Sequence, residues 1–191
     1  MKMETKPEQD RVASGGFIFR LGLADVLRLT MFGTIIALAN DVLRMPLHLP
    51  GHTNIWWMGI MVLGVGLIPR PGAGTIMGLV SALVTALFGL GVHGLVDFFM
   101  FLIPGVLLDL LAFLFRYRLE SLVIGAICGA LIGLSKLLVS LGMGTLLHMS
   151  LGFLFTGLAF PMVTHLVFGA IGGLIAAVLV KRLRPRMVTW E

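Results

Sequence analysis

The feature that most constrains this chain is a succession of long apolar runs, separated by short segments that hold most of its charges. Hydrophobic residues make up 58% of its 191 residues, and charged side chains make up only 12%. Its mean hydropathy is +1.05. Soluble domains usually carry about 25% charged residues. The sequence therefore predicts an integral membrane protein.

Six of the apolar runs are candidates for membrane-spanning helices. Run 55–68 is short for a span of about 17 to 25 residues, so a re-entrant hairpin with the next run is the alternative. A hairpin would place Arg70 at its tip inside the bilayer, at a cost of about 2.5 kcal/mol or more, and two crossings are therefore favoured. The predicted spans are 27–45, 55–68, 73–90, 94–115, 121–141 and 155–180.

The distribution of basic residues predicts the orientation, because cytoplasmic loops hold an excess of Lys and Arg. With the amino terminus inside, 11 of the 14 Lys and Arg residues lie in cytoplasmic segments. The other three, Arg28, Arg44 and Lys136, lie within predicted spans, and the outer loops carry none. We therefore predict an all-α membrane protein, a compact bundle of six transmembrane helices with both termini cytoplasmic.

Three segments of different character are expected along the chain. The first sixteen residues mix both signs of charge and lack the order of a signal peptide, so no cleavage is expected. We predict a cytoplasmic or interfacial segment over 1–24, the six-helix membrane domain over 25–185 and a cytoplasmic tail over 186–191.

Several classes of chemistry are disfavoured by the residues present. Cys128 is the single cysteine, which excludes a disulfide framework and a CxxC pair. The stretch Gly133-Leu134-Ser135-Lys136 lacks the second glycine of an intramembrane serine protease, and no HExxH or P-loop pattern occurs. We therefore expect no enzyme and no cofactor, and active transport would need an ATPase partner.

Small residues spaced four apart recur in the predicted helices, for example at Gly33 and Ala37. Such spacing makes a smooth helix face, and close backbone approach stabilises helix pairs in lipid. Each face is open to two interpretations: internal packing of the bundle, or docking of another membrane subunit. For Gly33 and Ala37 we predict the second role, docking of another membrane subunit.

Polar residues gather toward the predicted outer side, where they are candidates for a pocket closed by the 46–54 loop. Charges inside a bilayer are costly and usually face the protein interior. Simpler roles remain open: an ion pair between Asp41 and Arg44, a snorkelling Lys136, and an interfacial tryptophan belt. The predicted substrate-binding residues are Asp41, Arg44, His52, Asn54, Trp57, His93, Asp97 and Lys136.

A metal site is the competing interpretation of this region, because imidazole binds nickel, cobalt and zinc. His48 and His52 have the spacing of a helical ligand pair, but Pro46 and Pro50 argue against a helix there. Aromatic walls beside mixed charges instead favour a vitamin-sized organic ligand. A small channel or an oligomeric structural membrane protein is a further alternative, although the sequence has no continuous line of polar residues that would form a pore.

Over about residues 25–185 the chain resembles the substrate-binding S components of energy-coupling factor (ECF) transporters. The resemblance rests on the size, the six spans with both ends inside, and the small residues from Gly33 to Ala37. It also rests on the loop 48–54, the turn 69–75, and Pro104-Gly105 with Asp109.

This resemblance implies a capture subunit in a prokaryotic cell membrane, working with a membrane T component and two cytoplasmic ATPases. Such subunits are thought to topple in the membrane and carry a bound micronutrient inward. Metal-specific relatives usually begin with a Met-x-His segment, from which Met1-Lys2-Met3 departs. The resemblance therefore favours a vitamin or related micronutrient, with cobalt or nickel as the alternative.

Overall fold

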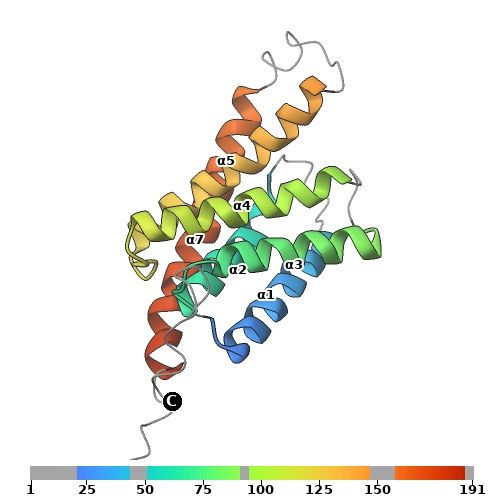
Figure 1. Cartoon of the computed structure of the whole chain (residues 1–191). Coiled ribbons are helices and arrows are strands. Elements are labelled where there is room, and N and C mark those ends of the chain that lie inside the picture. The colour runs from blue at the N-terminus through green and yellow to red at the C-terminus, as the bar shows by residue number, and fades with distance from the viewer. Residues whose placement is uncertain (1–20, 44–50, 91–94, 147–157, 188–191) are drawn as a thin grey trace, which may run out of the picture.

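The computed structural model of the chain describes residues 21–43, 51–90, 95–146 and 158–187 (Figure 1). These residues form six helices. Four of them, α1, α4, α5 and α7, are long and apolar enough to cross a membrane, whereas α2 and α3 are apolar but shorter. The helices are α1 Leu23–Val42, α2 Asn54–Leu67, α3 Ala73–Phe88, α4 Leu95–Leu114, α5 Leu122–Leu146 and α7 Ala159–Met187.

The predicted all-helical class is confirmed, and each helix overlaps one predicted span. The largest difference is in α7, which begins at Ala159 and continues through Pro185 to Met187, beyond the predicted end at 180. Backbone hydrogen bonding does not stop where the side chains become charged, so the helix extends past its apolar part. Six crossings and cytoplasmic termini stay predictions.

The turn between α2 and α3 is set by its prolines and glycine. Pro69 and Pro71 interrupt the apolar run, and Gly72 precedes α3 with φ of +89°. Gly89, with φ of +63°, follows the last residue of α3. Glycine adopts this left-handed backbone without the steric cost of a Cβ, so both ends of α3 are defined by the sequence.

Helices α5 and α7 lie side by side in Figure 1 and meet along what we call the α5–α7 seam. A Cβ on Gly129 would collide with the carbonyl oxygen of Gly169, and one on Gly173 would collide with that of Gly125. Only glycine allows backbones to approach so closely. The predicted four-residue spacing on these two helices therefore serves internal packing.

A second close contact, the α3–α4 seam, joins Gly74 and Gly78 to Gly105. A Cβ on Gly105 would lie 2.5 Å from the carbonyl oxygen of Gly74, and one on Gly78 would lie 2.7 Å from that of Phe101. Gly105 follows Pro104, which lies inside α4. The two seams hold the four helices α3, α4, α5 and α7 in two close pairs.

Helix α2 occupies the middle of the bundle, with eight of its residues buried, Met58, Met61 and Val62 among them. Cys128 of α5 is also fully buried. By contrast, large apolar side chains such as Leu87, Phe113 and Val123 are exposed on the outer faces. An apolar exterior around a packed core is the arrangement that a lipid environment requires.

Candidate functional site

Two polar side chains at the start of α2 are buried together. Asn54 and Trp57 lie one helical turn apart, and the indole Nε1 donates a hydrogen bond to Asn54 Oδ1 at 3.2 Å. The amide Nδ2 of Asn54 is also buried, and none of the residues that the structure describes accepts a hydrogen bond from it. It points toward α5, where a Cβ on Gly133 would lie 3.5 Å away.

The ammonium group of Lys136 lies over the face of the Trp57 ring. Lys136 Nζ lies 4.7 Å from the centroid of the Trp57 ring and 5.7 Å from that of Phe101. Phe101 meets Trp57 edge-on, with ring centroids 5.6 Å apart. Lys136 Nζ also reaches Asn40 Oδ1 at 3.5 Å. Side chains from α1, α2, α4 and α5 therefore converge on one point, which is consistent with the cation–π geometry that stabilises buried ammonium groups.

Acidic side chains lie in the same half of the bundle. Asp97 is buried in the first turn of α4, four residues before Phe101 and therefore on the same helix face. Asp41 is half-buried in the last turn of α1, next to Asn40. Asp41, Asp97 and Lys136 all have interaction partners. Charges of both signs are thus present close to the aromatic pair.

Two histidines flank this region. His52 lies in the turn before α2, and its neighbour Gly51 packs against the ring of His165 in α7, where a Cβ would lie 2.7 Å from Nδ1. His165 Nδ1 is 2.8 Å from the carbonyl oxygen of Pro161, one turn earlier. The turn that begins α2 is therefore seated against α7.

Six of the predicted substrate-binding residues lie in one half of the bundle, with Asp41 at its margin. We call this group the Asn54–Lys136 cluster; it consists of Asp41, His52, Asn54, Trp57, Asp97 and Lys136. Arg44 and His93 lie outside the described residues. Phe101 and His165 were not predicted. The sequence could have indicated Phe101 only through its place one helical turn after Asp97. His165 lies opposite Gly133 in the α5–α7 seam.

The predicted docking residues, Gly33 and Ala37, are both buried within the chain. A Cβ on Gly33 would lie 2.8 Å from Val80 Cβ, and Ser81 Oγ donates a hydrogen bond to the Gly33 carbonyl at 2.8 Å. In the structure, this face of α1 therefore packs internally against α3 rather than being open for docking. A docking role would require this contact to open.

A different polar group fixes the opposite end of α4. Asp109 accepts hydrogen bonds from the backbone N–H groups of Gly74 and Thr75 at 2.8 and 2.7 Å, and from Thr75 Oγ1 at 2.6 Å. These amides are the unsatisfied donors at the start of α3, so Asp109 caps α3 from a neighbouring helix. We call this the Asp109 cap.

The turn after α4 places the phenol of Tyr117 near this cap. Burial raises the pKa of Tyr117, and the negative charge of Asp109 raises it further. At the same end of the bundle, Arg70 Nε pairs with Asp25 Oδ2 at 3.3 Å. The turn between α2 and α3 is thus tied to α1 and α4.

Among the side chains that the structure describes, no three His, Cys, Asp or Glu residues lie close enough to hold a metal ion together. His48, His93 and His148 fall outside those residues. The Asn54–Lys136 cluster instead offers a carboxamide, an ammonium group, aromatic rings and carboxylates. These groups suit an organic molecule with polar substituents.

Comparisons with known proteins agree with this architecture. Residues 20–135 match the model of a family described as "ABC-type cobalt transport system, permease component". A crystal structure of an S-component of an ECF transporter superposes with a TM-score of 0.60, covering 89% of this chain and 87% of that chain at 16% identity. At this identity the likeness concerns the fold. None of the curated proteins searched matches the chain.

Proposed function

Because the chain belongs to the family of ABC-type cobalt transport system permease components and has the fold of an ECF transporter S component, we propose that it is the substrate-binding subunit of an importer. It captures a vitamin or related micronutrient outside the membrane. A membrane T component and two cytoplasmic ATPases then drive delivery inward. The observation that carries the proposal is the buried amide nitrogen of Asn54, which has no acceptor among the described residues and lies in the cluster around Trp57 and Lys136.

The Asn54 amide is the group that a ligand completes. A buried donor without an acceptor costs about 1 to 3 kcal/mol, a cost that a bound ligand removes by supplying the acceptor. Trp57 holds the Asn54 carboxamide in place by donating to its oxygen at 3.2 Å, which leaves the nitrogen available for recognition. The ligand therefore carries a hydrogen-bond acceptor.

The aromatic pair and the charges give the ligand its remaining features. Trp57 and Phe101 supply apolar ring surface, and Lys136 and Asp97 supply opposite charges beside it. A small planar molecule with polar substituents satisfies both, which is why a vitamin-like compound is the substrate class proposed. His52 and Gly51 close the site from the turn before α2, seated on His165.

The orientation proposed with this function has six crossings and both termini cytoplasmic. It puts the Asn54–Lys136 cluster toward the outside and the Asp109 cap toward the cytoplasm. Arg70, Arg116 and Arg118 are all exposed at the cap end, in agreement with the excess of basic residues in cytoplasmic loops. The substrate would then be captured outside and released after the chain reorients.

Cobalt or nickel is the second candidate, because the description of the family names cobalt. In that case carboxylates and imidazoles, rather than the Asn54 amide, would govern affinity. The two candidates therefore differ in which side chains matter as well as in the ligand.

The test is isothermal titration of the purified chain against a panel of vitamins, and separately against Co²⁺ and Ni²⁺ with and without a chelator. We expect heat from one organic ligand, with Asn54→Ala weakening its affinity roughly 5- to 150-fold. The matched control is Ser135→Ala, since Ser135 is also buried and adjoins Lys136, and its hydroxyl donates to Ile132 O of its own helix at 2.7 Å. Equal affinities for both variants would place the substrate elsewhere, and heat from cobalt or nickel alone would favour the metal.

A further inference from the structure

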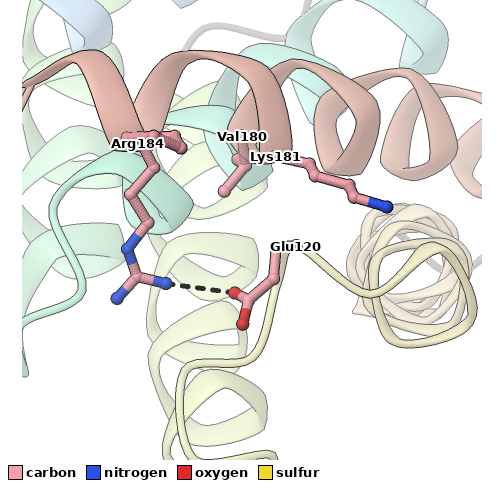
Figure 2. Close-up of a pocket in the computed structure, with 5 residues that line it drawn as sticks. Glu120, Val180, Lys181 and Arg184 are labelled. Carbon is pink, nitrogen blue, oxygen red and sulfur yellow. Dashed lines mark hydrogen bonds and ion pairs between the residues drawn. The ribbon is translucent and has the colours of Figure 1, made fainter.

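A groove lies at the cap end of the bundle, far along α5 and α7 from the Asn54–Lys136 cluster. It has a volume of about 320 Å³ and is lined by Glu120, Val180, Lys181, Arg184 and Pro185. Figure 2 shows Arg184 and Lys181 leaving α7 on either side of Val180, with Glu120 facing them from the segment before α5. Nothing in the substrate cycle proposed above uses these residues.

The cationic side of this groove is held in position. Arg184 Nη1 donates to Glu120 Oε2 at 3.0 Å, with both side chains partly exposed, so the guanidinium is fixed at the groove and its other N–H groups remain at the surface. Lys181 is exposed and directed away from Glu120 (Figure 2). Two positive charges face one negative charge, which leaves the groove with a net positive charge.

The floor of the groove is apolar and rigid. Val180 is fully buried, and its side chain fills the space beside Gly66 of α2, where a Cβ would collide with it. Pro185 lies inside α7 and has no N–H, so the carbonyl of Lys181 loses its helical donor. An acceptor for a hydroxyl group is thereby added next to the two cations.

An exposed apolar stripe leads into the groove along α7. Ile171, Leu174 and Val178 are all exposed and lie on the helix face that continues to Lys181 and Pro185, at spacings of three and four residues. The helix rises roughly 15 Å over the ten steps from residue 171 to residue 181, which is half of the about 30 Å hydrocarbon thickness of a bilayer. The stripe therefore matches the acyl chains of one leaflet.

We propose that this groove binds an anionic glycerophospholipid, with its phosphate at Arg184 and Lys181 and its acyl chains along Ile171, Leu174 and Val178. The combination of a basic groove and a leaflet-length apolar stripe requires an amphipathic occupant, and a free phosphate would leave the stripe unused. Arginine recognises phosphate oxygens through paired N–H donors. A headgroup hydroxyl, as in phosphatidylglycerol, finds acceptors in the Lys181 carbonyl and Glu120.

Native mass spectrometry of the full chain in detergent tests the proposal, with phosphatidylglycerol and phosphatidylcholine of identical acyl chains as ligands. The parent chain should bind phosphatidylglycerol at least tenfold more tightly. Lys181→Gln should weaken that binding about fivefold, and the double variant with Arg184→Gln about 25-fold. Arg182→Gln is the matched control, because Arg182 is an exposed basic residue of the same helix that does not line the groove.

Arg184→Lys separates a built site from general surface charge and from misfolding, because it keeps the charge and removes only the paired donors. We expect it to weaken phosphatidylglycerol binding severalfold, while Arg182→Lys has no effect and both variants keep the parent's melting temperature. The proposal is overturned if Arg182→Gln weakens binding as much as Lys181→Gln. It is equally overturned if phosphatidylcholine binds as well, or if glycerol phosphate without acyl chains competes with equal affinity.

Discussion

Helix α4 carries one carboxylate toward each of its ends, and the two differ in the hydrogen-bonding groups around them. Asp109 belongs to a cap in which three donors converge on its two oxygens. Asp97, twelve residues earlier and roughly 18 Å away along the helix, adjoins a cluster in which the buried amide nitrogen of Asn54 has no acceptor among the described residues. One polar region is complete within the chain, and the other is open to a further group.

This difference separates structural from functional polarity in a membrane bundle. Every intramembrane polar residue is costly, so its presence alone does not distinguish the two roles. A saturated network, such as the Asp109 cap, stabilises the fold without a ligand. The Asn54–Lys136 cluster has its hydrogen-bonding capacity partly unused, as expected of a site that a ligand completes.

The largest effect is expected from Asp109→Ala, which leaves the donors at the start of α3 without their acceptor. We expect a loss of about 2 to 4 kcal/mol in the free energy of unfolding, since each unsatisfied donor costs about 1 to 3 kcal/mol and water replaces part of the loss. Thermal unfolding in detergent measures it. Substrate affinity of the folded fraction should be unchanged, and a variant that is stable but binds poorly would contradict the comparison.

Gly105→Ala should have the next largest effect, because the added Cβ would lie 2.5 Å from the carbonyl oxygen of Gly74 in the α3–α4 seam. Separating the two helices costs about 1 to 3 kcal/mol. The control is Gly142→Ala in α5, where a Cβ meets nothing within 4 Å and the gain in helix propensity is about 0.5 to 1 kcal/mol. Similar melting temperatures for both variants would show that the seam tolerates separation.

The sequence predicted the helices well, because apolar length, proline and glycine act locally. Pro69, Pro71 and Gly72 ended one helix and began the next where expected. The end of α7 was not predicted, because hydropathy changes at Lys181 whereas the helical hydrogen bonds continue to Met187. The sequence also left open whether Gly33 faces a partner or α3, since spacing identifies a smooth face but not its neighbour.

The candidate site was predicted only in part. Polarity within apolar runs identified Asp97 and Lys136, because such residues stand out against their surroundings, and Asn54 was identified in the loop before the run 55–68. Phe101 did not stand out, since one phenylalanine among 13 is ordinary until its helix is oriented toward Trp57. The Asp109 cap joins residues 35 positions apart, and its geometry follows from helix packing rather than from local pattern.

A smaller effect is expected from Lys136→Met, which removes the cation from the Trp57 ring and keeps the side-chain length. The cation–π contribution of about 0.5 to 2 kcal/mol corresponds to a roughly 2- to 30-fold loss of substrate affinity if the ligand contacts this ammonium group. Titration calorimetry measures the affinity, and thermal unfolding serves as the control for folding. A large loss of stability with unchanged affinity would assign Lys136 to the structural class instead.

The smallest effect concerns Tyr117, whose pKa is raised above its ordinary value near 10 by burial and then by Asp109. The folded chain holds the phenolic proton more tightly than the unfolded chain. The associated stability is therefore fully present below pH 10 and is lost as the pH rises through the folded pKa.

Tyr117 is the single tyrosine of the chain, so tyrosinate absorbance during alkaline titration reports on it alone. We expect a midpoint above 10 in the parent, and a lower midpoint in Asp109→Asn because the neighbouring negative charge is removed. An unchanged midpoint would mean that the cap and the phenol are electrostatically independent.

The burial of Cys128 has a practical consequence for orientation in the membrane. The chain has one cysteine, and its thiol is enclosed beside the α5–α7 seam, out of reach of water-soluble maleimides. The native sequence is therefore a silent background for labelling, and no cysteine need be removed before a new one is introduced. A cysteine introduced at position 53 or position 71 would be the only thiol that reacts. Its labelling would show from which side of the membrane the reagent reaches the start of α2 and the turn between α2 and α3.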